Sequence, residues 1–208
     1  MTADAPQTTG EEIALFPLNT VLFPGGPLPL RIFEPRYVDM VSNCLRERRG
    51  FGVVLIRSGN EVGPAEFESV GTLARIVDFH TLADGLLGLA NVGELRFRIR
   101  AHRRRDDGLN VGEVMWLEPE PETSLPGEFR HLPAIVESLL SECGDLYTHV
   151  EQHPQDAVWV SYRLAELLPL TLPSRQFCLE LRDPLERLRL LGQLCTGALI
   201  EPTFAARD

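Results

Sequence analysis

The chain has 208 residues, of which 44% are hydrophobic and 7% aromatic, enough for an ordinary globular core and too apolar for a disordered chain. Its 20 basic residues are all arginines, and its 30 acidic residues give a net charge of −10, so the chain as a whole repels nucleic acid and anionic membranes. The absence of lysine excludes a Walker A nucleotide site, a Ser–Lys peptidase dyad and Schiff-base chemistry, because each needs a lysine side chain.

The amino terminus, the lack of a long apolar stretch and the cysteines indicate a cytoplasmic protein. Residues 1–10 carry no positive charge and no apolar run, so we expect a disordered tail and no signal peptide. No apolar stretch approaches the roughly 18 residues that a membrane span needs. The four cysteines, Cys44, Cys143, Cys178 and Cys195, are scattered among apolar residues without a CxxC pair, which predicts reduced, buried thiols and no metal or cofactor.

The first half of the chain has the pattern of short strands with one helix. Strands are predicted at Ile13–Phe16, Leu28–Phe33, Phe51–Ile56, Val70–Phe79, Gly85–Ala90, Glu94–Ala101 and Leu109–Leu117. The prolines in the first two favour edge or bulge positions, and Pro17 is expected to end the first. A helix is predicted from Pro35 through the arginines that precede Gly50, which would end it. This pattern favours a small, partly closed β-barrel.

The composition changes at Glu118–Glu122, where three acids and two prolines predict a stiff, solvated linker. Beyond it, apolar residues recur at helical spacing. Helices are predicted over Leu132–Leu140 and Val158–Leu168, from a Ser174 cap to Leu181, and from an Asp183 cap onward. The resulting α+β organisation has a barrel at 11–118, a linker at 119–124, a small helical bundle at 125–199, and tails at 1–10 and 200–208.

Several segments match one family in order and spacing. They are Phe16–Leu18, Leu22–Pro24, Leu28–Tyr37 (LPLRIFEPRY), Phe51–Leu55, Val70–Ile76, Gly93–Ile99 and the later Leu168–Leu188. Together they resemble the Lon protease amino-terminal, substrate-binding domain. The resemblance covers most of residues 11–199 and implies a PUA-like, partly closed β-barrel followed by a helical bundle. The chain ends at Asp208, so we expect a bacterial stand-alone form without the ATPase and peptidase domains.

The resemblance implies a role in recognising polypeptides. Our hypothesis is a non-catalytic protein that binds exposed or unfolded polypeptide segments, as an adaptor in proteolysis or quality control. Its expected partners are such segments and a separate protease or chaperone, and no membrane. We expect a shallow apolar groove between barrel and bundle, with strand addition at an edge as a further mode. The candidate peptide-binding residues are Leu22, Phe23 and Leu28, in a loop with two glycines. Plain core packing is the alternative for all three.

The charged residues of the RIFEPRY segment allow two interpretations. Glu34 lies between Arg31 and Arg36 in the sequence, and a carboxylate between two guanidiniums would pin the turn from strand to helix. This structural role is the favoured interpretation. The alternative is a clamp for a peptide carboxylate or backbone, in which Glu34 would compete for the arginines.

Two further groups of residues have the spacing of a binding site, and each also has a simpler explanation. Arg96, Arg98 and Arg100 alternate with apolar residues, so a strand would place them on one face. That face is either solvated or an RNA- or phosphate-binding stripe, and the lack of interleaved aromatic residues disfavours nucleic acid. His149 and His153 have the i, i+4 spacing of helical metal ligands, but exposed histidines are favoured over a metal site.

Overall fold

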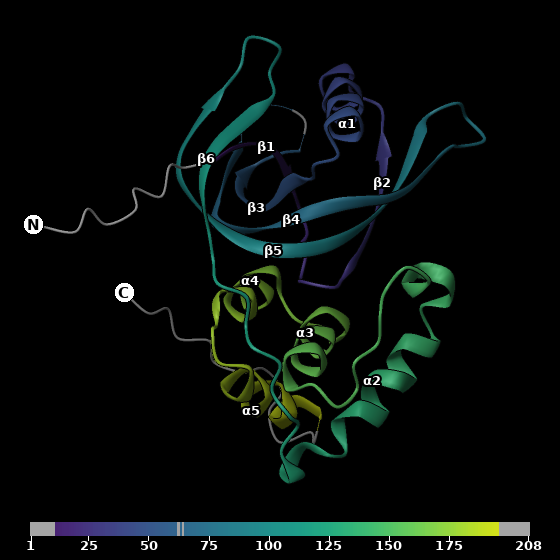
Figure 1. Cartoon of the computed structure of the whole chain (residues 1–208), viewed down its shortest axis with the longest axis vertical. Helices are drawn as coiled ribbons and strands as arrows, with labels where there is room; N and C mark the ends of the chain where they lie inside the picture. Colours follow the sequence, from purple (N-terminus) through teal and green to yellow (C-terminus); the bar gives the residue numbers. More distant parts are fainter. Residues whose placement is uncertain (1–10, 62, 64, 196–208) are drawn as a thin grey trace, which may run out of the picture.

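The computed structural model describes residues 11–61, 63 and 65–195, so the predicted tails at 1–10 and 200–208 lie outside the described residues. The described chain has two layers, a curled sheet with one helix and a group of helices against it (Figure 1). The strands come from the first half of the sequence and all helices but one from the second. The predicted α+β class is confirmed.

Six strands form one mixed sheet. They are β1 (Glu11–Leu18), β2 (Pro27–Ile32), β3 (Phe51–Gly59), β4 (Ala65–Thr81), β5 (Leu87–Arg104) and β6 (Asn110–Trp116). Their order is β2-β5-β4-β3-β1-β6, and the far half of β5 also pairs with β6, so the sheet curls round into a partly closed form. Only the β1–β3 pair is parallel among these ladders.

Two strand predictions need correction. The segments expected as separate strands at Gly85–Ala90 and Glu94–Ala101 form the single strand β5. The chain does not turn between them, because register shifts against β4 absorb the bend and the Gly93 N–H donates to the Gly26 carbonyl at 2.9 Å. Pro17 does not end β1 either. The pairing with β6 stops at Leu15, so Pro17 has a sheet neighbour on the β3 side alone, a position that proline tolerates.

The helix α1 (Pro35–Glu47) begins at the predicted proline but ends earlier than predicted. Its last turn is closed by Arg48, which takes the left-handed conformation at φ 53°, and not by Gly50. Gly50 serves a different purpose. A Cβ there would lie 2.4 Å from the Ala74 carbonyl oxygen, so the glycine permits close approach of the chain to β4.

The second half contains two short 3-10 turns, η1 (Gly127–Phe129) and η2 (Gly144–Tyr147), and the helices α2 (Leu132–Ser141), α3 (Ala157–Leu167), α4 (Leu172–Glu180) and α5 (Pro184–Cys195). The predicted cap of the last helix is confirmed, because the Asp183 carboxylate accepts the Leu185 N–H at 2.8 Å. The cap of α4 is Thr171 and not Ser174, whose N–H instead donates to the Thr171 hydroxyl at 3.3 Å.

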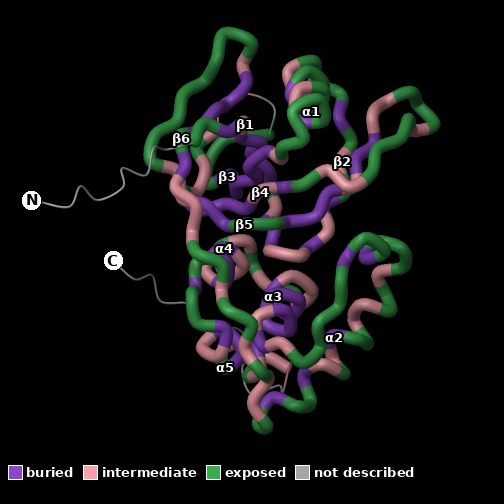
Figure 2. Tube along the Cα trace, viewed as in Figure 1, coloured by how far each residue is buried: buried purple, intermediate pink, exposed green. Residues whose placement is uncertain are grey.

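The largest apolar core cluster contains side chains from both the sheet and the helices. The largest cluster of buried side chains surrounds α3 and includes Val21, Phe23, Leu55 and Val70 from the sheet half. A second cluster lies between the sheet and α1. Buried residues accordingly run through α3 and the inner strands (Figure 2). Among the helices of the described chain, none is long and apolar enough to cross a membrane.

Candidate functional site

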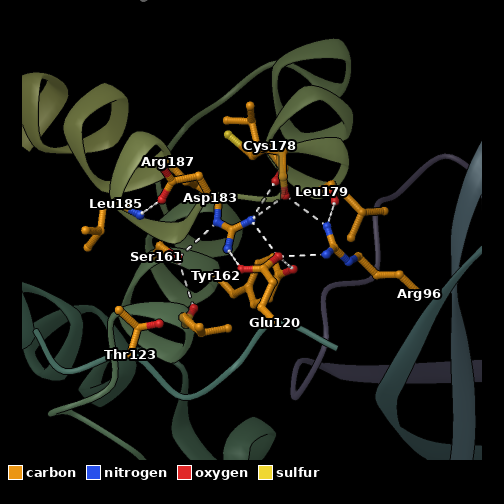
Figure 3. Close-up of polar contacts among 12 residues, drawn as sticks. Arg96, Glu120, Thr123, Ser161, Tyr162, Cys178, Leu179, Asp183, Leu185 and Arg187 are labelled. Carbon is orange, nitrogen blue, oxygen red and sulfur yellow. Dashed lines mark hydrogen bonds and ion pairs between the residues drawn. The ribbon is translucent and has the colours of Figure 1, made fainter. Parts of the chain in front are cut away.

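A cluster of buried charges joins the sheet to the helices (Figure 3). Glu120 lies between Arg96 of β5 and Arg187 of α5. One carboxylate oxygen is 2.8 Å from Arg96 Nη2, and the other is 2.5 Å from Arg187 Nη2. All three side chains are at most 4% exposed. Buried charges of this kind are stable only when paired and hydrogen-bonded, so the three residues depend on one another.

The two guanidiniums also satisfy backbone carbonyls at the end of α4. Arg96 donates to the carbonyls of Leu179 and Leu181 at 2.6 and 2.9 Å, and Arg187 donates to those of Cys178 and Leu181 at 3.2 and 3.0 Å. These helix-end carbonyls have no further turn of helix to bond to. Several donors in one plane are a property of arginine that lysine lacks. The cluster therefore fixes the C-terminal end of α4 against the sheet.

Tyr162 of α3 completes the cluster. Its hydroxyl donates to the Glu120 carboxylate, and the Arg187 guanidinium lies 3.8 Å from the centre of its ring. Burial raises the pKa of this phenol, although the nearby Arg187 opposes the shift. The hydroxyl therefore stays protonated and remains a donor to Glu120. A cation over a desolvated aromatic face adds to the stability of the cluster.

This cluster corrects two sequence predictions. The Glu118–Glu122 segment is not a fully solvated linker, because Glu120 is buried and the N–H of Thr123 just beyond it donates to the Asp156 carboxylate at 3.0 Å. The face carrying Arg96, Arg98 and Arg100 is not uniformly solvated either. It lies partly under α4, so Arg96 is 5% exposed and engaged in the cluster.

Because Arg96 is buried and bonded within the cluster, it cannot contribute to a nucleic-acid-binding stripe. Arg98 contacts the Ser69 hydroxyl at 3.3 Å, and Arg100 contacts the Met115 sulfur at 3.4 Å. Further along β5, Arg103 pairs with an acidic residue, Glu12. We therefore do not propose a nucleic-acid function.

A third buried arginine, Arg163, holds the turn before β2. Arg163 of α3 is fully buried, donates to the carbonyls of Pro24 and Gly25, and lies 3.1 Å from the Glu166 carboxylate. Tyr147 donates to the same carboxylate at 2.7 Å. Burial raises the pKa of Glu166, although Arg163 opposes that shift. The glycine-containing loop is thus tied to α3 and does not move freely.

The predicted peptide-binding residues lie in the core. Leu22, Phe23 and Leu28 are 3%, 0% and 8% exposed. Leu22 and Leu28 pack between the sheet and α1, whereas Phe23 packs into the helical bundle against Tyr162. In this conformation they offer almost no surface to a ligand, so a candidate site has to be built from other residues.

The RIFEPRY charges form one ion pair and not the predicted triad. Glu34 lies 2.8 Å from Arg36, which also donates to the Gly108 carbonyl at 2.7 Å and so ties α1 to the β5–β6 turn. Arg31 instead pairs with Asp84, because its side chain is exposed on β2 beside the β4–β5 turn. Glu34 is therefore paired with one guanidinium and not with the two that were expected.

The two histidines do not share a helix face. His149 and His153 lie exposed in the segment between η2 and α3. Within the described ranges, no group of three or more His, Cys, Asp or Glu side chains could hold a metal ion.

Cysteine reactivity should follow burial. Burial raises the pKa of Cys178 to about 11, so at pH 8 only about one thiol in a thousand is a thiolate. Cys143 is partly exposed. We expect iodoacetamide to label Cys143 of the native protein well before Cys178, with Cys178 labelling increasing as the pH rises toward 11. Mass spectrometry of digested samples checks this order, and denatured protein, in which all four cysteines should react alike, is the control. Equal native rates would contradict the burial.

A groove opens between the sheet and the helical bundle, with a volume of about 800 Å³. Its apolar surface comes from Leu55 and Ile56 of β3, from Leu172, Pro173 and Phe177 of α4, and from Leu181. Its charged and polar lining comes from Arg57, Glu68, Gln176, Glu180, Arg182, Asp183 and Glu186. Pro173 is exposed, Leu172 and Phe177 are half-buried, and the β3 residues form a nearly buried floor.

The walls of this groove are held rigidly. Gln176 donates to the Val70 carbonyl at 3.0 Å, which ties α4 to β4, and to the Glu180 carboxylate of its own helix at 2.8 Å. The Leu181 carbonyl behind the groove accepts from both Arg96 and Arg187. A preformed apolar hollow with polar groups at its border has the features of a ligand-binding site. We expected a groove at this junction, but the expected lining residues Leu22, Phe23 and Leu28 are buried and do not line it.

The curled sheet packed against a helical bundle is the fold of a substrate-binding domain. The family model described as the ATP-dependent protease La (LON) substrate-binding domain matches residues 12–196, and the chain belongs to this family. The matched model describes the substrate-binding domain of Lon and not its ATPase or peptidase domain. Family membership supports a role in substrate recognition.

Known proteins and structures agree with this assignment. A crystal structure of a Lon N-terminal domain protein from Xanthomonas campestris is 40% identical, with a TM-score of 0.73, and the match covers 89% of this chain and 98% of that one. The N-terminal domain of a Mycobacterium avium complex Lon protease, 20% identical with a TM-score of 0.58 over 91% of this chain and all of that one, shares the fold. The Lon protease of Cytophaga hutchinsonii is 24% identical over 188 residues, 85% of this chain, which spans only 23% of that relative's length.

Proposed function

We propose that this chain binds exposed or unfolded apolar segments of other proteins in the groove between its sheet and its helical bundle. The groove itself carries the proposal, because it combines an apolar floor, half-buried apolar walls and a charged border. Family membership supports protein substrates as the ligands. Delivery of the bound segments to a separate protease or chaperone is the adaptor role that we propose for it.

The dimensions and rigidity of the groove support an extended segment as the ligand. A volume of about 800 Å³ is near the upper end of ordinary ligand sites, which measure about 300–1,000 Å³. Walls fixed by the buried charge cluster do not have to become ordered on binding, and this lowers the entropic cost of association. Apolar side chains of the segment would cover Leu172 and Phe177, and each square ångström removed from water contributes about 25 cal/mol before the cost of association.

Strand addition is the weaker binding mode. β2 is paired with β5 alone among the described strands, so one of its sides is an edge. Pro27 and Pro29 lie in that strand and lack the N–H that a further strand would need. We therefore place the client segment in the groove and not on this edge.

A binding experiment with an unfolded polypeptide tests the proposal. The probe is fluorescein-labelled, reduced and carboxymethylated α-lactalbumin, followed by fluorescence anisotropy. Phe177→Ala should weaken its binding about five- to thirtyfold, the effect of truncating a central apolar contact worth about 1–2 kcal/mol. Phe79→Ala is the matched control, because Phe79 is 55% exposed on β4 and does not line the groove.

Circular dichroism and urea unfolding of both variants separate lost binding from lost folding. Unchanged affinity in folded Phe177→Ala would exclude the groove as the binding site. Absence of binding to the unfolded chain at high micromolar protein would contradict the proposed function itself.

A further inference from the structure

The border of the groove carries more negative than positive charge. Four acids line it, Glu68 on β4 and Glu180, Asp183 and Glu186 around the junction of α4 and α5, together with two arginines, Arg57 and Arg182. The formal balance is 2 − 4 = −2. Arg57 is also only 3.1 Å from the Glu66 carboxylate, so part of its charge is already compensated. A ligand lying in the groove therefore meets a border with a net negative formal charge.

Two of these acids are held in place by the fold. The Glu180 carboxylate accepts from Gln176 at 2.8 Å, and the Asp183 carboxylate accepts the Leu185 N–H at 2.8 Å. Both residues are nevertheless exposed, so their carboxylates remain accessible to a ligand. Glu68 lies across the groove on the sheet side, so negative charge is present on both walls. Fixed charges beside an apolar, poorly hydrated surface act more strongly on a bound ligand than charges in open water.

From this arrangement we infer that the groove selects apolar segments flanked by lysine or arginine. This inference rests on the proposed function and adds the class of segment. Proteins place charged gatekeeper residues beside aggregation-prone apolar stretches, so a basic flank is a common feature of such stretches. The apolar part contacts the floor of the groove while the basic flanks lie against the acidic border, and acidic flanks are repelled. Complementary charge of this kind determines specificity and association rate more than total affinity.

Three peptides that share one apolar hexapeptide core distinguish this selection from plain apolar binding. One carries two lysines at each end, one two serines and one two glutamates, and titration calorimetry measures their dissociation constants. At low salt the lysine-flanked peptide should bind about tenfold more tightly than the glutamate-flanked one, with the serine-flanked peptide between them. In 0.5 M NaCl the difference should shrink to about twofold, because exposed charges are screened.

Charge-removing variants assign the preference to the border. In the Glu68→Gln, Glu180→Gln double variant the lysine-over-glutamate preference should fall from about tenfold to about threefold. The matched control is the Glu113→Gln, Glu142→Gln double variant, which removes the same charge from exposed positions outside the groove and should retain the preference.

The outcomes separate this inference from the function on which it rests. If all three peptides bind equally, or the control variant loses the preference as fully as the groove variant, the charge selection is overturned while groove binding stands. Tighter binding of the glutamate-flanked peptide would also overturn it. If no peptide binds, the proposed function fails and the selection fails with it.

Discussion

Replacing Glu120 with alanine is expected to lower the free energy of unfolding by about 3–5 kcal/mol, because the change leaves charged guanidiniums buried without their counterion. The Arg96 and Arg187 side chains are 4% and 0% exposed, so water cannot replace the carboxylate. The Tyr162 hydroxyl loses its acceptor as well. Urea unfolding followed by circular dichroism measures the loss.

The matched control is Glu118→Ala, two residues earlier in the same segment. Glu118 is exposed, so its replacement should change stability by no more than about 0.5 kcal/mol. Combining Glu120→Ala with Arg187→Ala should destabilise by less than the sum of the two single changes, because both remove the same interaction. A loss below about 1 kcal/mol for Glu120→Ala, or strict additivity, would show that the cluster does not act as a unit.

Replacing Gly93 with alanine should also destabilise the protein strongly, by about 1–3 kcal/mol or more, through overpacking. A Cβ at this position would lie 2.2 Å from the Phe23 carbonyl oxygen, a backbone atom that cannot rotate away. Gly93 also exchanges backbone hydrogen bonds with Gly25 and Gly26, at 2.8 and 2.9 Å. Moving that turn would disturb the carbonyls that Arg163 holds.

The same substitution at another glycine, Gly192→Ala, should have the opposite effect on stability. Gly192 lies within α5, where the nearest side-chain atom to an added Cβ, from Leu132, is 3.9 Å away. Alanine should therefore stabilise the helix by about 0.5–1 kcal/mol. Thermal or urea unfolding of both variants checks the contrast. If Gly93→Ala were as stable as the parent protein, the close approach of β5 to the Phe23 carbonyl would be wrong.

The elements of the fold were largely predictable because their signals are local. Short apolar runs between turn signals marked most strands, and three-to-four spacing with caps such as Asp183 marked the helices. The errors arose where the sheet overrode local signals. Gly93 had the pattern of a break between strands, but its hydrogen bonds to the turn at Gly25–Gly26 keep β5 continuous.

The buried charge cluster could not be located from the sequence. Glu120 and Arg187 are 67 positions apart, and Arg96 bonds a carbonyl 83 positions away, so only the tertiary fold brings them together. Residue type alone does not show whether a glutamate in a linker or an arginine in a strand is solvated or buried. One signal was available for the related Arg163. Its helix α3 is apolar on nearly every side, which is typical of a central helix whose polar residues are buried too.

The residues that line the groove could not be predicted from the sequence. We expected a shallow apolar groove between barrel and bundle, but residue type alone does not show whether an apolar residue such as Phe23 lies in a core or in a groove. Leu172 and Phe177 line the groove because α4 is held against β4 by Gln176, which leaves a hollow between α4 and β3. That packing involves contacts such as Gln176 to Val70, 106 positions apart.

The place of β1 in the sheet has a consequence for how the chain folds. The first strand pairs with β3 and with β6, and Leu15 has Gly52 as its partner on one side and Asn110 on the other. The second ladder closes a loop of almost a hundred residues, and non-local pairings of this kind slow folding because their entropy must be lost before they form. During synthesis β1 therefore has no partner on its β6 side until the last strand has left the ribosome, and we expect closure of the sheet to be a late step, with β1 vulnerable to misassociation until then.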